Sequence, residues 1–210
     1  MKTIRLQNKV ITTIATVLIL AMVSCRENRD NGIMIQLPYD TMREGDFVLR
    51  RGRSMTSNLV IMRDKHSYSH IGMLQKSDSG WCVIHAVNDE YDFKGDFDRV
   101  KIEKIERFFS YERASAGAIV HSFVGDSIAE KISQKALQHV KDSTRFDNSF
   151  ITDENSELYC TELIYVLYKE HGIDITEGRR TKAGLFGLPE KIIFPSDIVE
   201  NKKLNIYFDF

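Results

Sequence analysis

The chain has 210 residues, a formal charge of −1 and three cysteines. This length suits one ordinary domain, and three cysteines are too few for a disulfide framework. No basic stripe with interleaved aromatic residues occurs, so nucleic acid is not an expected partner. No cysteine pair or His/Cys cluster has zinc-ligand spacing, so we expect neither a metal nor another cofactor.

The first 24 residues have the layout of a secretory signal peptide. Lys2, Arg5 and Lys9 form a basic start, and an apolar stretch over residues 10–23 follows. That stretch is too short for a comfortable membrane span of about 20 residues. Removal of residues 1–24 takes away three basic and no acidic residues, so the formal charge moves from −1 to −4.

The signal ends in "MVSC", which places the small residue Ser24 directly before Cys25. This pattern resembles the lipobox of bacterial lipoproteins, in which the cysteine is acylated and becomes the new N-terminus. We therefore predict lipidation of Cys25, a polar tether over residues 25–42 and a folded domain over residues 43–210. The protein would then be anchored to a membrane of the bacterial cell envelope, outside the cytoplasm. The alternative is an ordinary signal peptide with an incidental cysteine.

The folded part begins with a short apolar run after a Gly-Asp turn signal, which predicts a strand over residues 47–49. "SMTSNLVIMRDK" predicts a short helix with Leu59 and Met62 facing inward. "YSHIGMLQKSDSGWCVIHAV" reads as two strands around a turn, and residues 102–109 have the spacing of a short amphipathic helix.

The second half continues the mixture of helices and strands. "AGAIVHSFVG" predicts a strand, and "SIAE", residues 127–130, predicts a capping box that opens a helix. "KIIFPSDIV" and "KLNIYFDF" supply late turns and a last strand. Sequential strands flanked by helices are typical of the α+β class.

"NSELYCTELIYVLYKEHG" places Cys160 where an amphipathic helix begins. Leu163, Ile164 and Leu167 lie on the same face as the cysteine. Unpaired N–H groups and the positive end of the dipole at a helix start stabilise a thiolate, so we expect a lowered pKa for Cys160. A buried structural cysteine is the alternative. Cys82 is expected to be a small core residue, although a disulfide between the two is compatible with the sequence.

Two histidines share one face of the predicted hairpin. If "SDSG" is the loop, Lys76 faces Trp81 and Gly72 faces His85. His70 and His85 then become diagonal neighbours roughly 7–8 Å apart by backbone, and Gly72 leaves room for the imidazole. A cysteine nucleophile needs such a base and an orienting group. The alternative is that each histidine is a surface or core residue with its hydrogen bonds satisfied.

Five segments in this order resemble one known family: "EGDFVL", "YSHIGM", "CVIHAV", "RFDNSF" and "YCTELIYVLYKEHGI". The chain is similar, from Arg43 to its C-terminus, to the YiiX/YaeF-like permuted papain-like cysteine hydrolases of the NlpC superfamily. The resemblance implies a circularly permuted papain-like fold, with an antiparallel sheet or half-barrel packed against helices. It also places the histidine before the cysteine in the chain.

The resemblance assigns roles by position. Cys160 matches the nucleophile, His70 the base, and His85 the third polar residue, which is often an acid in the family. Residues 146–147 match a structural element before the cysteine helix, and Asp46 matches the Gly-Asp turn, which we interpret as structural.

These assignments predict a cysteine hydrolase that works through a Cys-His-polar triad and an acyl-enzyme. An amidase or peptidase acting on peptides, which could belong to the cell wall, is the first expectation. A lipid acylhydrolase or acyltransferase is the second enzymatic expectation. A catalytically silent lipoprotein that binds a ligand in the same groove is the rival from another class, because His85 departs from the commonest family pattern.

Overall fold

The computed structural model describes residues 35–152, 156–183 and 189–210. The signal peptide and Cys25 lie outside these ranges, so their predictions stay predictions. Residues 37–210 form one compact unit, which includes residues 37–42 that we predicted to be part of the tether. No helix within the described ranges is long and apolar enough to cross a membrane.

The unit is built on a six-stranded sheet in which every neighbouring pair is antiparallel. The strand order is β4-β3-β2-β1-β5-β8. The strands are β1 (Phe47–Gly52), β2 (His70–Ser77), β3 (Gly80–Val87), β4 (Arg99–Lys104), β5 (Ala114–His121) and β8 (Asn205–Asp209). A separate small hairpin pairs β6 (Thr181–Lys182) with β7 (Lys191–Ile192).

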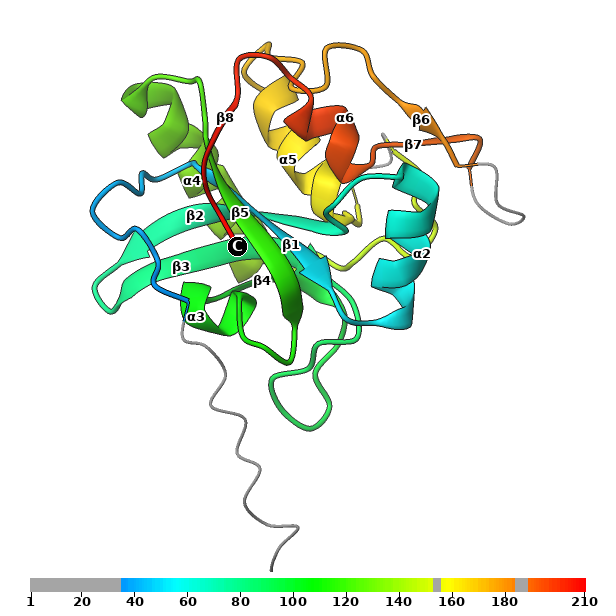
Figure 1. The fold of residues 1–210 in the computed structure, drawn as a ribbon, viewed down its shortest axis with the longest axis horizontal. Helices are drawn as coiled ribbons and strands as arrows, with labels where there is room; N and C mark the ends of the chain where they lie inside the picture. The colour runs from blue at the N-terminus through cyan, green and yellow to red at the C-terminus, as the bar shows by residue number, and fades with distance from the viewer. Residues whose placement is uncertain (1–34, 153–155, 184–188) are drawn as a thin grey trace, which may run out of the picture. The chain divides into compact units, whose positions relative to one another are not determined.

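Five helices surround the sheet in the part of the chain that the structure describes. They are α2 (Met55–Asp64), α3 (Ile105–Phe108), α4 (Asp126–Lys141), α5 (Cys160–Lys169) and α6 (Pro195–Val199). Figure 1 shows α5 crossing the sheet and α2 beside the end of β1. This mixture of helices with an antiparallel sheet confirms the predicted combination of elements.

The hairpin of β2 and β3 has the predicted register. Lys76 pairs with Trp81, and Ser77 pairs with Gly80, so only Asp78 and Ser79 form the turn. The loop is therefore shorter than predicted, but the pairing is unchanged because both strands extend by one residue toward each other. His70 and His85 consequently lie on the same face of the sheet.

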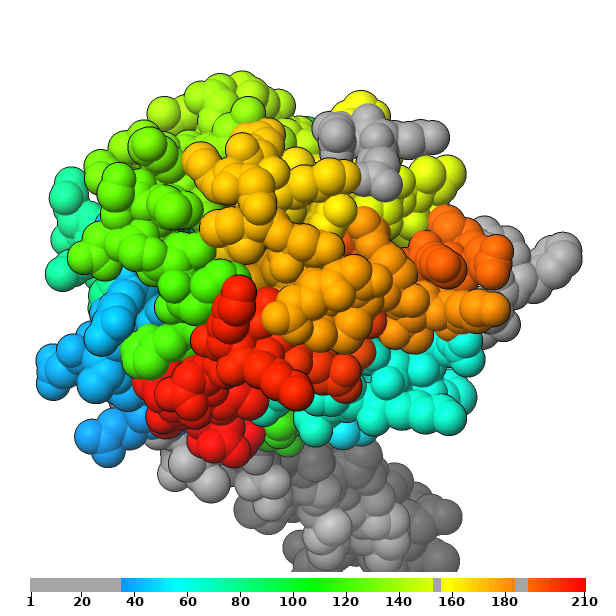
Figure 2. Space-filling view, turned by 90° about the horizontal axis from the view of Figure 1, so that it is seen from above, coloured from blue at the N-terminus to red at the C-terminus, as the bar shows by residue number. Residues whose placement is uncertain are grey.

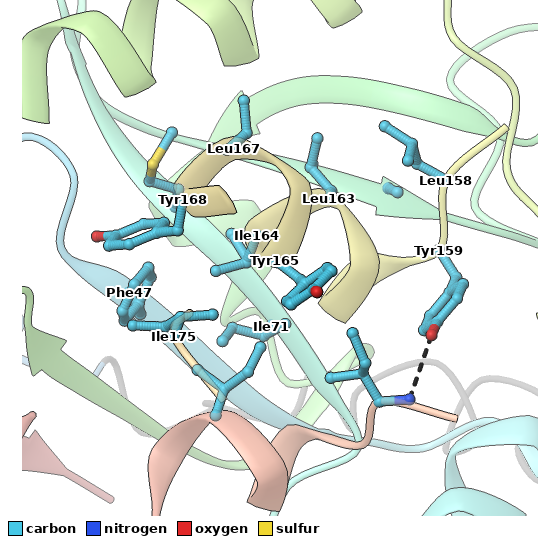
Figure 3. Close-up of a cluster of buried hydrophobic side chains, with 14 of the residues drawn as sticks. Phe47, Ile71, Leu158, Tyr159, Leu163, Ile164, Tyr165, Leu167, Tyr168 and Ile175 are labelled. Atoms are coloured by element: carbon cyan, nitrogen blue, oxygen red, sulfur yellow. Dashed lines mark hydrogen bonds between the residues drawn. The ribbon is translucent and has the colours of Figure 1, made fainter. Parts of the chain in front are cut away.

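The main core lies between the sheet and α5. Phe47 of β1 and Ile71 of β2 face this core together with Leu163, Ile164 and Tyr168 of α5, and all five are buried. Figure 3 shows these side chains in contact around the helix. Alternation along the strands sends the intervening residues to the opposite face, where the polar cluster described below lies.

The segment before α5 is held by a buried tyrosine. The Tyr159 hydroxyl accepts a hydrogen bond from the Ile193 backbone N–H at 3.2 Å, drawn in Figure 3, and lies 2.7 Å from the Thr152 hydroxyl. Tyr159 is also the N-cap residue of α5. The start of the helix is therefore fixed to the segment between β7 and α6.

Three local predictions are wrong. The helix predicted over residues 102–109 is only the short α3, because residues 102–104 belong to strand β4 and pair with β3. Helix α2 has no buried residue, and Leu59 and Met62 are 49% and 68% exposed. The apolar stripe of this helix faces solvent because α2 packs beside the end of β1 and presents its more polar side to the protein. Helix α4 begins at Asp126 with Gly125 as its N-cap and no capping hydrogen bond from a side chain, so Ser127 lies inside the first turn and forms no capping box.

Asp46 joins three parts of the unit. Its carboxylate accepts hydrogen bonds from the backbone N–H groups of Arg43 and Ser122, both at 3.1 Å, and from the Tyr207 hydroxyl at 3.1 Å. It also lies 3.0 Å from His121 Nδ1. Figure 2 shows the red C-terminal residues at the surface, and the contact with Tyr207 fixes β8 to the turn before β1.

Candidate functional site

Cys160 is the first residue of α5, as predicted. The N-cap Tyr159 makes no side-chain capping hydrogen bond, so no cap side chain occupies the N–H groups of the first turn. The cysteine is partly exposed, and its thiol forms no disulfide. It lines the larger of two cavities described below.

The pKa of the Cys160 thiol is raised above its ordinary value, and burial is the main cause. Hydrogen bonds with the backbone of Ile71 and Thr161 and the positive charge of Arg50 act in the opposite direction. The prediction of a lowered pKa was therefore wrong. The helix start does favour the thiolate, but the neighbouring chain removes more hydration from the charged form than the helix start restores.

His70 and His85 are in direct contact. His70 Nε2 lies 2.8 Å from His85 Nδ1, and the rings meet edge to face with centroids 5.1 Å apart. Both side chains are buried. The ring of Phe108 packs against both imidazoles, at centroid distances of 5.8 Å and 5.4 Å, and so separates them from water. The predicted diagonal pair is confirmed.

Gly72 makes room for this pair. A Cβ atom at Gly72 would lie 2.4 Å from Val83 Cγ1 and 3.2 Å from His85 Cβ. The first distance is shorter than any normal contact, so a larger residue would push on β3 where His85 begins. The predicted role of Gly72 as open space beside His85 agrees with these distances.

Burial lowers the pKa of both His70 and His85 well below 6.5, with the positive charge of Arg50 as the next cause. Lys101 and Arg113 act in the same direction. Both imidazoles are therefore neutral at pH 7. The raised pKa of Cys160 favours a neutral thiol as well, in the cavity that this residue and His70 line together.

Glu103 is a site residue that the sequence reasoning missed. Its Oε1 lies 3.2 Å from His85 Nε2, although the ring N–H is not aligned with it as in a regular hydrogen bond. In β4, Lys101 pairs with His85 and Glu103 pairs with Val83, so Glu103 is a diagonal neighbour of His85 on the same face. The alternation in "RVKIEK" was the available signal for this strand.

Charged side chains surround the histidines on this face of the sheet. Arg113 contacts both Glu103 and Glu90, and Glu90 also pairs with the buried Arg50. The Arg50 guanidinium lies over the Phe108 ring at 4.5 Å and donates to the Phe108 carbonyl at 3.1 Å. Buried ions of both signs thus compensate one another, as burial requires.

Cys160 and His70 line one cavity of about 480 Å³, a size suited to a small ligand or a short chain segment. Its apolar lining includes Val60, Phe146 and Phe150. Serine, arginine and acidic side chains line the remainder. A second cavity of about 240 Å³ shares Tyr91 and Phe146 with the first.

Two further sequence predictions concern residues away from this cavity. Cys82 is a buried thiol without a disulfide, as expected of a small core residue. Asp147 is buried and accepts hydrogen bonds from the backbone N–H groups of Ser149 and Ile151 at 2.7 Å and 2.8 Å. It therefore organises the turn after Phe146.

The fold is similar to that of a solved protein, the metalloprotein yiiX from Escherichia coli O157:H7. The two structures align with a TM-score of 0.65 over 80% of this chain and 97% of the yiiX chain, at 17% sequence identity. No family model matches the sequence, and no curated protein sequence matches it. This chain has a yiiX-like fold. The resemblance to yiiX that the ordered motifs indicated is thereby confirmed at the level of the fold.

Proposed function

We propose that this chain is a thiol-dependent hydrolase with a circularly permuted papain-like fold. One observation carries the proposal: Cys160, at the start of a helix, and His70, backed by His85, line the same cavity. A nucleophile, a base and a group that orients the base are the parts that acyl transfer requires. Cys160 is the nucleophile, His70 the base and His85 the orienting residue.

The reaction begins from the neutral pair. His70 accepts the thiol proton as Cys160 Sγ attacks the substrate carbonyl carbon, and the carbonyl electron pair moves onto oxygen. The Cys160 backbone N–H stabilises that oxyanion. Collapse of this tetrahedral intermediate expels the leaving group, which takes the proton from His70. Water, deprotonated by His70, then attacks the thioester, and the acid product leaves with the thiol regenerated.

The leaving group we favour is an amine, which makes the protein an amidase or peptidase. The polar lining supports this choice, because Ser57 and Asn88 offer hydrogen-bonding groups around the cavity that an extended peptide could use. Lipidation of Cys25 would hold the enzyme at a membrane of the bacterial cell envelope, close to cell-wall peptides. No part of the mechanism requires nucleic acid.

A lipid acylhydrolase or acyltransferase is the second candidate, and helix α2 favours it. Met55, Leu59 and Met62 form an exposed apolar stripe on this helix, while its residues Thr56, Ser57 and Val60 line the cavity. An acyl chain could therefore pass along this apolar stripe to reach the cavity and Cys160. The lipid anchor would bring the same apolar stripe close to membrane substrates.

A metal centre does not fit the residues that the structure describes. yiiX is described as a metalloprotein, but the described residues contain no group of three or more His, Cys, Asp or Glu side chains that could hold a metal ion. No step of the proposed reaction is therefore assigned to a metal.

Trapping of the acyl-enzyme tests this proposal. The full-length chain in mild detergent is mixed rapidly with an activated acyl ester, and peptide mass mapping locates the acyl group. We expect acylation at Cys160 but not at Cys82, with a strong loss in the His70→Ala variant and none of this adduct in Cys160→Ala. Release of the acyl group by water distinguishes a hydrolase from a trapped thiol. Equal, slow acylation of both cysteines would instead support the silent binding protein.

A further inference from the structure

We propose that Glu103 is a positioning residue that sets the proton on each histidine and so leaves the Nδ1 atom of His70 as the base. This inference rests on the proposed function and deepens it. The sequence resemblance assigns no role to Glu103. The Glu103 carboxylate contacts His85, and His85 contacts His70, so two residues separate this charge from the thiol.

The argument begins at His85 Nε2. This nitrogen is buried, and within the described ranges it has no aligned hydrogen bond to any group. The carboxylate oxygen of Glu103 at 3.2 Å is its ion-pair neighbour. A carboxylate only accepts hydrogen bonds, and a nitrogen lone pair facing it would be repelled. The proton of neutral His85 therefore resides on Nε2.

Arginines keep Glu103 in the role of an acceptor. Arg113 Nη1 donates to both carboxylate oxygens, at 2.9 Å and 2.7 Å, and Arg107 Nε lies 3.4 Å from Oε2. These charge-assisted contacts are strong and directional. They also hold the carboxylate in place beside His85, with Oε1 3.2 Å from Nε2.

The proton on His85 determines the proton on His70. With Nε2 protonated, His85 Nδ1 presents a lone pair to His70 Nε2 at 2.8 Å. His70 Nε2 must then carry the proton and donate it to this lone pair. Because burial keeps the pKa of His70 well below 6.5, the ring is neutral, and its Nδ1 is left unprotonated to accept the proton of Cys160.

The same chain of contacts stabilises His70 after it accepts the proton. Arg50, Lys101 and Arg113 all oppose a positive charge on His70. Through His85, the negative charge of Glu103 offsets part of that opposition at the moment when the imidazolium forms. Glu103 therefore acts on the proton-transfer step and not on substrate binding.

The experiment measures the tautomers directly. Nitrogen-15 NMR of the full-length protein, with histidine labelled in the ring, assigns the protonated nitrogen of His70 and His85 at pH 7.5. We expect Nε2–H on both in the wild type. A wild-type His85 protonated at Nδ1 overturns the inference without any variant being needed.

The variant Glu103→Gln adds the kinetic readout. Its amide can donate to His85 Nε2, which would reverse both tautomers and block His70 Nδ1. The corresponding reversal in a Ser-His-Asp triad lowers kcat about 10⁴-fold, so we expect kcat for acylation to fall on the order of 10²- to 10⁴-fold with KM unchanged. Glu103→Asp should restore part of this loss. Glu106→Gln, an exposed change on α3, is the matched control.

The outcomes separate the two proposals. If acylation of Cys160 depends on His70 but Glu103→Gln, still folded by its melting curve, reacts at the wild-type rate, the inference about Glu103 is wrong and the hydrolase proposal stands. If the wild-type tautomers are as expected but His70→Ala acylates normally, Glu103 sets the tautomers and the hydrolase proposal fails.

Discussion

Among the residues that the structure describes, two histidines each lie against a buried carboxylate. His121 Nδ1 is 3.0 Å from Asp46 Oδ2, and His85 Nε2 is 3.2 Å from Glu103 Oε1. By distance and residue type, the two contacts are nearly the same. Their surroundings differ, and this difference separates a structural contact from a candidate active site.

The contact between His121 and Asp46 connects only groups that hold the fold together. Its carboxylate also binds two backbone N–H groups and the Tyr207 hydroxyl, and the His121 ring stacks on Tyr207 with centroids 3.7 Å apart. The contact at Glu103 continues through His85 to His70, which lines a cavity with a thiol. The second imidazole nitrogen, and what it reaches, therefore decides whether a His–carboxylate pair can do chemistry.

The largest expected effect separates the two histidine systems by activity. His70→Asn removes the base, so we expect acylation of Cys160 to slow by roughly 10²- to 10⁴-fold. His121→Asn should leave this rate within about twofold. Rapid-mixing mass spectrometry measures both. A slow His121→Asn variant with a normal melting curve would mean that the Asp46 contact also serves the site.

The next effect separates the two carboxylates by stability. Asp46→Ala removes the acceptor for two backbone N–H groups and a hydroxyl, so we expect a loss of roughly 2–4 kcal/mol in the free energy of unfolding. Asp40→Ala, at an exposed turn residue, should change it by less than about 0.5 kcal/mol. Urea denaturation gives both values. Equal stabilities would contradict the structural role of Asp46.

A smaller change disturbs only the His85 side. Gly72→Ala places a Cβ within 2.4 Å of Val83 Cγ1, so we expect a cost of about 1–3 kcal/mol and slower acylation through displacement of His85. The NMR signals of His121 should not move. Shifts of His121 as large as those of His85 would show that the two regions are coupled through the sheet.

The last comparison is a dependence of stability on pH, which we expect from the His70–His85 pair. The folded-state pKa values of His70 and His85 lie well below the unfolded value of about 6.5. The unfolded chain therefore binds more protons as pH falls below about 6.5, and stability decreases by up to about 1.4 kcal/mol per pH unit for each histidine. Chemical denaturation between pH 7 and pH 5 measures this slope. In His70→Asn only His85 of the pair remains, so the contribution of the pair to the slope should be about half as large.

Local patterns were sufficient for the hairpin and the cysteine helix. Alternation and turn residues set the pairing of β2 with β3, because a shift by one residue would expose an entire buried face. This pairing brings His70 to His85. Apolar spacing placed Cys160 at the beginning of α5 for the same kind of local reason.

Other features depend on what packs against a residue, and no local pattern reports that. The pKa of Cys160 is raised because distant segments bury it, and Glu103 reaches His85 only because β4 pairs with β3. The apolar stripe of α2 faces solvent because this helix lies beside the end of β1. The sequence by itself determined the pairing of β2 with β3 and the position of Cys160 at the start of α5. Burial, charge neighbours and the outward face of α2 were decided by the tertiary structure, because they depend on segments far away in the chain.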